Sequence, residues 1–325
     1  MAASLIFCLG LGIGIFFTES EEVEKQSKKL EKLTQFDSFS INDKTQNSKT
    51  SQKVVATAKK NFYTKNDSGP SRQNHNYSVE KKDHLPKWID NSIPVFKKPG
   101  FSYIAIVLDD MGLNKKISDE IVELGRPLTL SFLSYAPNLI EQTTIASSRG
   151  HELMLHLPME PLGDEDPGPG ALLVEMKNME LKQRLNLALE KFPNFIGINN
   201  HMGSRFTSNS KLMKFLLSSL KKRGYLFLDS VTTSGSVALE MGRRLSAPVV
   251  ARDIFLDDVD NEKEVKLRLD QTELIAKKTG TAIAIGHPRK ATLRVLKDWM
   301  HGLEQKKIQL VPLSTIAQIR LDKIN

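Results

Sequence analysis

The chain has 325 residues, of which 40% are apolar, so it is long enough to bury a full hydrophobic core. Its net charge of +8 is uneven, because residues 19–100 hold 16 Lys and Arg against 11 Asp and Glu, whereas the rest of the chain holds 30 against 27. No basic run is interleaved with aromatic residues, which argues against a nucleic-acid-binding groove. The single cysteine, Cys8, allows no internal disulfide, so cysteine usage does not reveal the compartment.

The first segment, residues 2–18, is apolar and carries no charge. About 17 such residues lie at the lower limit for crossing a bilayer and also fit the apolar core of a secretory signal. No basic residue precedes the run and no small-x-small cleavage motif follows it. We favour an uncleaved signal-anchor over a cleaved signal, or over the apolar tip of a cytosolic protein. The anchor would hold the rest of the chain on the periplasmic side of a bacterial inner membrane.

The remainder divides into two parts. Residues 19–99 are rich in Lys, Glu, Ser and Asn and lack hydrophobic periodicity over most of their length, which predicts a disordered polar linker. The Lys-Lys-Pro-Gly sequence at 97–100 marks a boundary. Residues 100–325 have the composition of a globular domain.

Short apolar runs alternate with amphipathic stretches throughout this domain. The expected strands are 103–108, 128–133, 151–156, 195–199, 225–228, 248–251, 281–285 and 308–310, and the expected helices are 115–124, 138–148, 179–191, 211–223, 264–278 and 292–304. The alternation predicts an α/β fold with a parallel sheet, and about seven strands favour a distorted (β/α) barrel over a doubly wound sheet. Asp109 and Asp110 follow the first strand where a dinucleotide-binding fold would need glycines.

Almost every predicted strand ends in polar residues, and in a parallel barrel the carboxyl ends of the strands carry the functional groups. These residues are Asp109 and Asp110, His156, Asn199 to His201, Asp229 and Ser230, Arg252 and Asp253, and His287. A single Asp at such a position is often only a helix cap, and a single His is often structural. Six strand ends with the same property predict a shared site.

The residue types at these ends are chemically coherent. One carboxylate and two neutral imidazoles are a common ligand set for Zn²⁺ or a similar divalent ion. Neighbouring Asp side chains diverge on a regular strand, so we expect one to bind the metal and the other to act as a base. A histidine at another strand end would protonate the leaving group. His151 is expected to face away from His156 and to be structural.

Six motifs at these positions resemble the divergent polysaccharide deacetylase family. They are IAIVLDDMG (104–112), GHELMLHLPMEP (150–161), GINNHMGSRFT (197–207), FLDSVT (227–232), RDIFLD (252–257) and AIGHP (284–288). That family is similar to the larger polysaccharide deacetylase superfamily, whose members hydrolyse acetyl groups on sugars in a distorted (β/α) barrel with a metal-activated water. The resemblance covers essentially the whole globular part, in order.

The resemblance implies roles for three residues. Asp109 would be the general base, Asp110 a metal ligand and His287 the general acid. Water would attack the acetyl carbonyl, Asp109 would accept its proton, and His287 would protonate the departing amine or alkoxide.

The second ligand motif departs from the superfamily pattern of two histidines four residues apart. His156 matches the first histidine, and Glu160 stands at the position of the second. The third ligand is then either Glu160 or His201. We favour His201, because Pro158 is expected to reshape the loop that carries Glu160.

The third motif also departs, because the residues Asn199 to Ser204 replace the superfamily's Arg-x-Pro-Tyr sequence. The groups that orient the base and stabilise the oxyanion therefore cannot be transferred from the family. The candidates for supporting or substrate-binding roles are Asn200, Ser204, Asp229, Arg252 and Asp253. Caps and salt bridges are an equally good interpretation of the last three.

The sequence thus predicts a metal-dependent carbohydrate deacetylase-like hydrolase of the bacterial cell envelope. Its cofactor would be a divalent metal, with Zn²⁺ favoured, and its substrate an acetylated polysaccharide or a peptidoglycan-like glycan. The altered second and third motifs support one alternative, a catalytically inactive barrel that binds a glycan or an envelope partner. Another hydrolase on the same scaffold, for example one acting on phosphoesters, is a second alternative.

Overall fold

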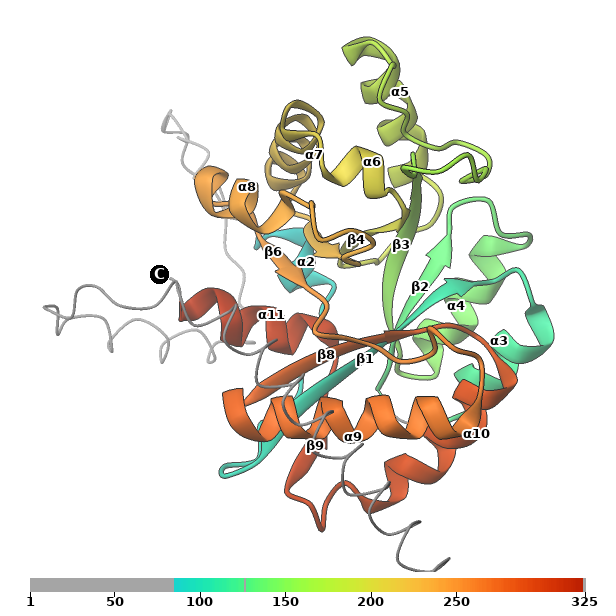
Figure 1. Cartoon of the computed structure of the whole chain (residues 1–325), viewed down its shortest axis with the longest axis vertical. Coiled ribbons are helices and arrows are strands. Elements are labelled where there is room, and N and C mark those ends of the chain that lie inside the picture. The colour runs from blue at the N-terminus through green and yellow to red at the C-terminus, as the bar shows by residue number, and fades with distance from the viewer. Residues whose placement is uncertain (1–84, 126, 324–325) are drawn as a thin grey trace, which may run out of the picture. The chain divides into compact units, whose positions relative to one another are not determined.

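The computed structural model describes residues 85–125 and 127–323 (Figure 1). The predicted anchor at 1–18 and the predicted linker up to residue 84 lie outside the described residues. None of the helices in the described part of the chain combines the length and the apolar character that crossing a membrane requires.

The described residues form a single parallel sheet with helices packed against it. Its strands are β1 (Ser102–Met111), β2 (Thr129–Leu133), β3 (Glu152–Met159), β4 (Gly197–Met202), β5 (Leu226–Asp229), β6 (Val249–Ala251), β7 (Ile254–Phe255), β8 (Thr281–Gly286) and β9 (Ile308–Leu310). The helices are α2 (Lys87–Asp90), α3 (Lys115–Val122), α4 (Leu139–Ser148), α5 (Asn178–Leu189), α6 (Ser204–Thr207), α7 (Ser210–Arg223), α8 (Ala238–Leu245), α9 (Glu262–Thr279), α10 (Lys290–Trp299), the 3₁₀ turn η2 (Met300–Gly302) and α11 (Leu313–Asp322).

The strand order is β6-β5-β4-β3-β2-β1-β8-β7, with β9 paired to β1, and every strand pair is parallel. The sheet curls toward a barrel (Figure 1). The barrel is open, because the terminal strands β6 and β7 do not pair with each other in the described sheet. The predicted distorted (β/α) barrel is confirmed. All eight predicted strands are present, whereas β7, α2, α6, α8 and α11 were not predicted.

Capping residues in the sequence set the ends of the longer helices. The Asn209 side chain accepts hydrogen bonds from the first turn of α7, and Asn261 does the same for α9. Both helices end at a glycine with positive φ, Gly224 at 75° and Gly280 at 92°, a conformation that costs glycine little. Each glycine turns the chain back toward the start of the following strand.

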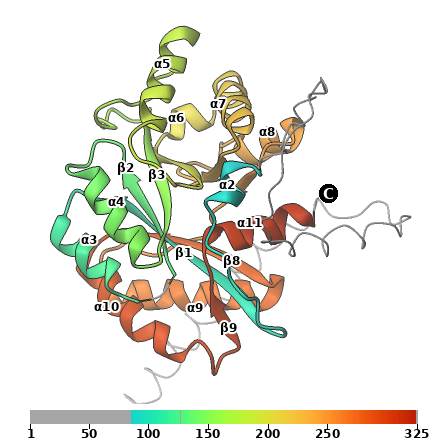
Figure 2. The same ribbon diagram turned by 180° about the vertical axis from the view of Figure 1, so that it is seen from behind.

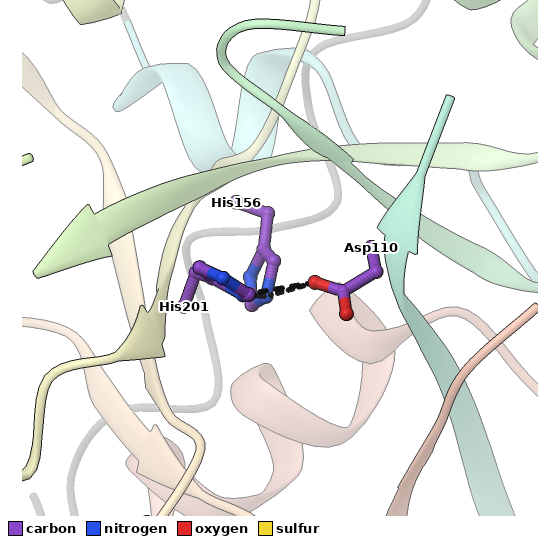
Figure 3. A group of neighbouring side chains, drawn as sticks. All are labelled: Asp110, His156 and His201. Carbon is purple, nitrogen blue, oxygen red and sulfur yellow. Dashed lines mark hydrogen bonds and ion pairs between the residues drawn. The ribbon is translucent and has the colours of Figure 1, made fainter. Parts of the chain in front are cut away.

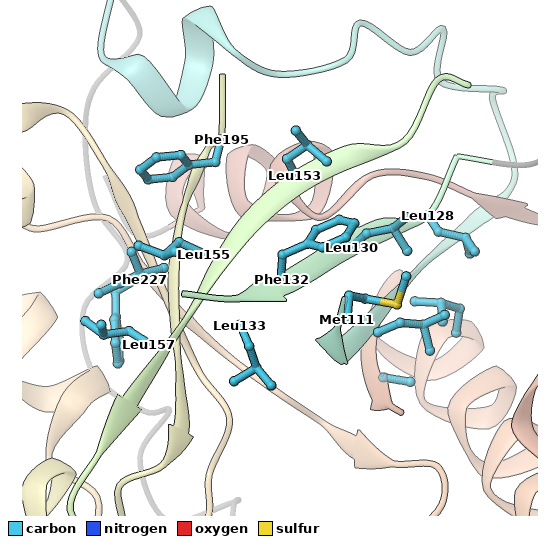
Figure 4. Packing of buried hydrophobic residues seen from close by; sticks show 14 of the residues in the cluster. Met111, Leu128, Leu130, Phe132, Leu133, Leu153, Leu155, Leu157, Phe195 and Phe227 are labelled. Carbon is cyan, nitrogen blue, oxygen red and sulfur yellow. The ribbon is translucent and has the colours of Figure 1, made fainter. Parts of the chain in front are cut away.

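Two buried clusters lie on the two faces of the sheet, because successive residues of a strand point to opposite sides. The larger cluster packs the sheet against the outer helices and includes Phe132, Phe195 and Phe227 (Figure 4). The smaller cluster joins alternate strand residues to α11 and to Trp88 of α2. Figures 1 and 2 show β8 and β1 lying between α9 and α11.

The strand residues of the smaller cluster lead directly to the polar strand ends. On four of the strands, the last apolar residue of this cluster is followed two positions later by a polar residue, which is expected on the same face. The pairs are Val107 and Asp109 on β1, Met154 and His156 on β3, Leu228 and Ser230 after β5, and Ile285 and His287 after β8. The candidate site is therefore the polar top layer of a buried apolar stack.

The segment before β1 packs more closely than the sequence suggested. Trp88 is 9% exposed, and its backbone N–H donates to the Gly224 carbonyl at 2.8 Å. Lys87 Nζ donates to the Tyr225 hydroxyl at 3.1 Å, and Asn91 Nδ2 donates to the Phe195 carbonyl at 2.9 Å. This part of the predicted linker belongs to the domain, because one aromatic side chain supplies burial that the average composition of residues 19–99 conceals.

Glu152, at the start of β3, is a buried acid far from the polar strand ends. Its carboxylate accepts hydrogen bonds from Thr129 Oγ1 at 3.1 Å, from the Ser314 backbone N–H at 3.1 Å and from the Ser314 hydroxyl. These contacts fasten the first turn of α11 to the sheet, where a negative charge also suits the helix dipole. Burial nevertheless raises the pKa of Glu152 to about 6, against the lowering effect of the hydrogen bonds.

Replacing Glu152 by glutamine tests whether folding raises the pKa of this carboxyl. The folded-state pKa of about 6 lies above the ordinary value of 4.5, so the protonated form is favoured by folding. The stability gained from that protonation is complete below the ordinary pKa and is lost as pH rises through about 6. We expect wild type to lose about 2 kcal/mol of unfolding free energy relative to Glu152→Gln between about pH 4 and about pH 7.5.

The measurement is urea denaturation of the full chain with a chelator present, so that metal binding does not contribute. A wild-type minus variant difference that is independent of pH would show that folding leaves the ionisation of Glu152 unchanged.

Candidate metal centre and its surroundings

A bulge at the end of β1 brings two neighbouring carboxylates to the same place. Between the pairs Leu108–Leu130 and Met111–Phe132, β1 contains one residue more than β2, and Asp110 has a φ of 55°. Asp109 Oδ2 lies 3.7 Å from His156 Nε2, and Asp110 Oδ1 lies 3.2 Å from the same atom. The divergence expected for a regular strand is thus removed by the extra residue and by the left-handed conformation of Asp110.

Asp110, His156 and His201 form a compact cluster at the ends of β1, β3 and β4 (Figure 3). Asp110 Oδ1 lies 2.9 Å from His201 Nδ1, and the two ring nitrogens lie 3.2 Å apart. His156 is buried, whereas the side chains of Asp110 and His201 are 32% and 16% exposed. The cluster is therefore closed at His156 and partly open to solvent at Asp110 and His201.

The donor atoms of this cluster suit a divalent cation. Asp110 Oδ1 is buried and has no hydrogen bond of good geometry, although both imidazoles lie within ion-pair distance of it. The three ligand atoms lie 2.9 to 3.2 Å from one another. This spacing suits three ligands of one ion that is bound at distances of about 2.0–2.2 Å. One carboxylate and two imidazoles are also a common set for zinc, so the residues fit such an ion.

Opposite charges compensate each other within the cluster. Burial alone would lower the pKa of His156, but the carboxylates of Asp109 and Asp110 raise it to about 9. Burial alone would raise the pKa of Asp110, but His156 and His201 hold it well below its usual range. A proton or a metal cation is therefore needed between these groups, and the two compete for the same nitrogen.

His287 stands beside the cluster and is held by a buried acid. Its Nδ1 lies 2.9 Å from Asp257 Oδ1, and its backbone N–H donates to Asp257 Oδ2 at 2.7 Å. Its Nε2 lies 3.8 Å from Asp110 Oδ2, so the free side of the ring faces the cluster. Burial opposes a charge on the ring, but Asp257 outweighs it and raises the pKa of His287.

Two residues of this site received no role from the sequence. Asp257 ends the RDIFLD motif, and its role became visible in its contacts with the ring and the backbone of His287. Asn199 is fully buried, and its Nδ2 donates to Asp109 Oδ1 at 2.7 Å. The available signal for Asn199 was its position two residues before His201, which places both on the same face of β4.

Asp109 itself is almost completely buried. Burial raises the pKa of Asp109 above its ordinary value, although His156, His287 and the hydrogen bond from Asn199 lower it. A carboxylate with a raised pKa binds a proton more readily than an exposed one does. The position of Asp109 thus suits proton acceptance.

The structure does not bring Glu160 into the cluster. Its Oε2 accepts a hydrogen bond from the Val174 N–H at 2.5 Å, and its Oε1 lies 3.2 Å from Arg205 Nη1. Pro158, expected to reshape a loop, instead lies within β3 in register with His201 on β4. The geometry therefore groups His201, rather than Glu160, with Asp110 and His156.

Asn200 and Ser204 hold the backbone around the site. Asn200 Oδ1 accepts from the Ser230 N–H at 3.0 Å, and its Nδ2 donates to the Met202 carbonyl at 2.7 Å. The Ser204 hydroxyl accepts from the Leu162 N–H at 2.7 Å. Both side chains are used by internal hydrogen bonds that tie neighbouring loops together.

Asp229, Arg252 and Asp253 also make internal contacts. Asp229 Oδ2 accepts from the Ser236 hydroxyl at 2.7 Å, and Asp253 Oδ2 pairs with Arg320 of α11 at 2.5 Å. Arg252 donates to two backbone carbonyls that follow β5, at 2.7 and 2.8 Å. Arg252 and Asp253 also line a cavity of about 460 Å³ beside the site, so a contact with substrate is compatible with their positions.

His151 faces away from the site, as the strand alternation predicted. Its Nε2 lies 2.8 Å from the Val122 carbonyl, and the Leu128 N–H donates to its Nδ1 at 3.3 Å. The ring therefore connects the end of α3 to the start of β2, and burial lowers its pKa.

Fold and cluster together define a (β/α)-barrel protein with a candidate metal centre at the carboxyl edge of a parallel sheet. The model of the divergent polysaccharide deacetylase family matches residues 106–317. The chain belongs to this family, and the resemblance seen in the six motifs is confirmed.

The chain is also similar to proteins from three bacteria. It is 34% identical over 213 residues to the uncharacterized protein YibQ of Escherichia coli K12, a match that covers 66% of each chain. It is 34% identical over 215 residues to an uncharacterized protein of Haemophilus influenzae, covering 66% of this chain and 76% of the relative. A crystal structure of an uncharacterized protein from Agrobacterium tumefaciens C58 has a TM-score of 0.69 and 27% identity, covering 72% of this chain and 96% of that one.

Metal binding tests the ligand set directly. We expect the chelator-treated full chain to take up about one Zn²⁺, and Asp110→Ala and His201→Ala to weaken that binding at least about 100-fold. Glu160→Gln should bind as wild type does, because its carboxylate is used by Val174 and Arg205. The measurement is a competition titration against a chromophoric chelator.

His301→Ala, which removes an exposed histidine from η2, is the matched control for the histidine variants. Equal losses in Glu160→Gln and His201→Ala, with both proteins folded, would contradict the assignment of His201.

Proposed function

We propose that this protein is a metal-dependent hydrolase that removes acetyl groups from an acetylated polysaccharide or peptidoglycan-like glycan. The observation that carries the proposal is the convergence of Asp110, His156 and His201 between a buried carboxylate and an acid-supported histidine. A divalent ion held by these three residues, with Zn²⁺ favoured, would polarise the acetyl carbonyl and make water more acidic.

Asp109 is the proposed general base. Its Oδ1 is held by Asn199, which leaves Oδ2 toward the cluster, 3.7 Å from His156 Nε2. The raised pKa of this carboxyl allows it to accept a proton from the attacking water. Asp110 cannot share this role, because the adjacent imidazoles hold its pKa well below its usual range.

His287 is the proposed general acid. Its Nδ1 donates to Asp257, so its second proton lies on Nε2, the nitrogen that faces the cluster. Asp257 raises the pKa of His287, which keeps that proton in place until the leaving group needs it. The proton would pass to the departing amine or alkoxide as its bond to the acetyl carbon breaks.

The location of the protein is part of the proposal. The uncharged apolar segment at 2–18 supports an anchor in the inner membrane of a bacterial envelope, with the domain on the periplasmic side. A glycan of the envelope would then be within reach. Family membership supports an acetylated carbohydrate as the substrate class.

Asp109→Asn tests the base. We expect the zinc-loaded full chain in detergent to release acetate from N-acetylated chitooligosaccharides or from O-acetylated glycans. The variant should lose on the order of 10² to 10⁴ in turnover, because its amide cannot accept the proton. Its zinc affinity should stay within about threefold of wild type, since Asp110, His156 and His201 remain.

Asp119→Asn, an exposed carboxylate paired with Lys115 on α3, is the control for this exchange and should keep full activity. A zinc-loaded wild type that binds glycan yet releases no more acetate than Asp109→Asn would favour the inactive glycan-binding barrel.

His287→Gln tests the acid through the leaving group. An amine must be protonated as it departs, whereas 4-nitrophenolate leaves without a proton. We expect the variant to lose on the order of 10² to 10⁴ in turnover of N-acetylated sugars but less than about tenfold with 4-nitrophenyl acetate. Equal losses on both substrates would exclude His287 as the proton donor.

A further inference from the structure

Asn199 lies behind the candidate site, and all its side-chain hydrogen-bonding capacity is used. Its Oδ1 accepts from Ser131 Oγ at 2.5 Å and lies 2.9 Å from His156 Nδ1. Its Nδ2 donates to Asp109 Oδ1 at 2.7 Å and to Ser230 Oγ at 3.1 Å. A primary amide has two N–H donors and two acceptor lone pairs, so no capacity is left over.

The surroundings allow only one orientation of this amide. A carboxylate oxygen is an acceptor only, so the amide edge that faces Asp109 must be the NH₂ group. The opposite edge, which faces His156, is then the carbonyl oxygen. Reversing the amide would set two oxygens 2.7 Å apart in a buried site, which carries a large cost.

The amide orientation determines in turn which nitrogen of His156 carries hydrogen. Facing a carbonyl oxygen at 2.9 Å, Nδ1 must be the N–H donor. The lone pair of the neutral ring is therefore on Nε2, the atom that lies 3.2 Å from Asp110 Oδ1 and 3.2 Å from His201 Nδ1.

We propose that Asn199 is the positioning residue that couples the base to the metal centre. One amide holds the Asp109 carboxylate and the metal-binding tautomer of His156 at once. It thereby fills the role of base-orienting group that the altered third motif left unassigned. The inference rests on the proposed metal centre, but its physical tests need no substrate.

Two variants separate the contact of Asn199 with His156 from its contact with Asp109. Asn199→Ala removes both contacts, whereas Asn199→Asp keeps an acceptor toward His156 and places a second carboxyl against Asp109, so that the two carboxyls share a proton and Asp109 is no longer free to accept one. We expect Asn199→Ala to weaken zinc binding about 10- to 100-fold, the effect typical of residues that orient a metal ligand. Asn199→Asp should bind zinc no more weakly than wild type, yet lose turnover as Asp109→Asn does.

The first readout is the side-chain ¹⁵N–¹H spectrum of the histidines in the metal-free and zinc-loaded full chain. A His156 Nδ1–H signal protected from solvent exchange is expected in wild type and in Asn199→Asp, and should be absent from Asn199→Ala. The second readout is zinc affinity, and the third is turnover.

Asn200→Ser is the matched control, because this neighbouring asparagine faces Met202 and Ser230 rather than the cluster. It should retain the protected signal and the wild-type zinc affinity. Wild-type zinc affinity and a protected signal in Asn199→Ala would overturn the proposal. Equal loss of zinc binding in both Asn199 variants would also overturn it, because that pattern reflects general damage to the fold. Absence of acetate release from wild type would count against the proposed hydrolysis and leave the signal and affinity tests intact.

Discussion

Parallel pairing of the strands is the constraint on which the candidate site depends. Parallel strands end at the same edge of the sheet, and alternate residues point to the same face. On the inner face, Ala105 and Val107 of β1, Met154 of β3, and Ile283 and Ile285 of β8 are apolar, and the next residues on that side are Asp109, His156 and His287. The apolar part of the stack excludes water from below, so the polar layer above it titrates and hydrogen-bonds in a largely buried setting.

Burial at the strand ends is tolerated because charges of opposite sign are placed together. Unpaired buried charges would cost several kcal/mol each, and removing one partner from such a set is strongly destabilising. Here Asp110 faces His156 and His201, and Asp257 faces His287. Asp109 is the exception, because burial outweighs the nearby imidazoles and the hydrogen bond from the neutral Asn199 amide and leaves its pKa raised. The same arrangement that stabilises the cluster therefore leaves one carboxylate suited to accept a proton.

The bulge in β1 connects local conformation to this division of roles. Without the extra residue, Asp109 and Asp110 would point to opposite faces of the sheet. With it, both approach His156 Nε2, and each enters a different environment, one against Asn199 and the other against two imidazoles. Two chemically identical side chains thus acquire different pKa values and different proposed functions.

The sequence by itself determined the parallel α/β barrel and the residues at its strand ends. Hydrophobic alternation and capping residues act over a few neighbours, so β1, β3 and β8 with their terminal Asp109, His156 and His287 could be predicted. Only the tertiary structure decided which ends meet. The contact of Asn199 with Asp109 joins residues 90 positions apart, and the exclusion of Glu160 depends on Val174 and Arg205. Strand register and the bulge in β1 bring Asp109 and Asn199 together, and neither leaves a periodic signal along the chain.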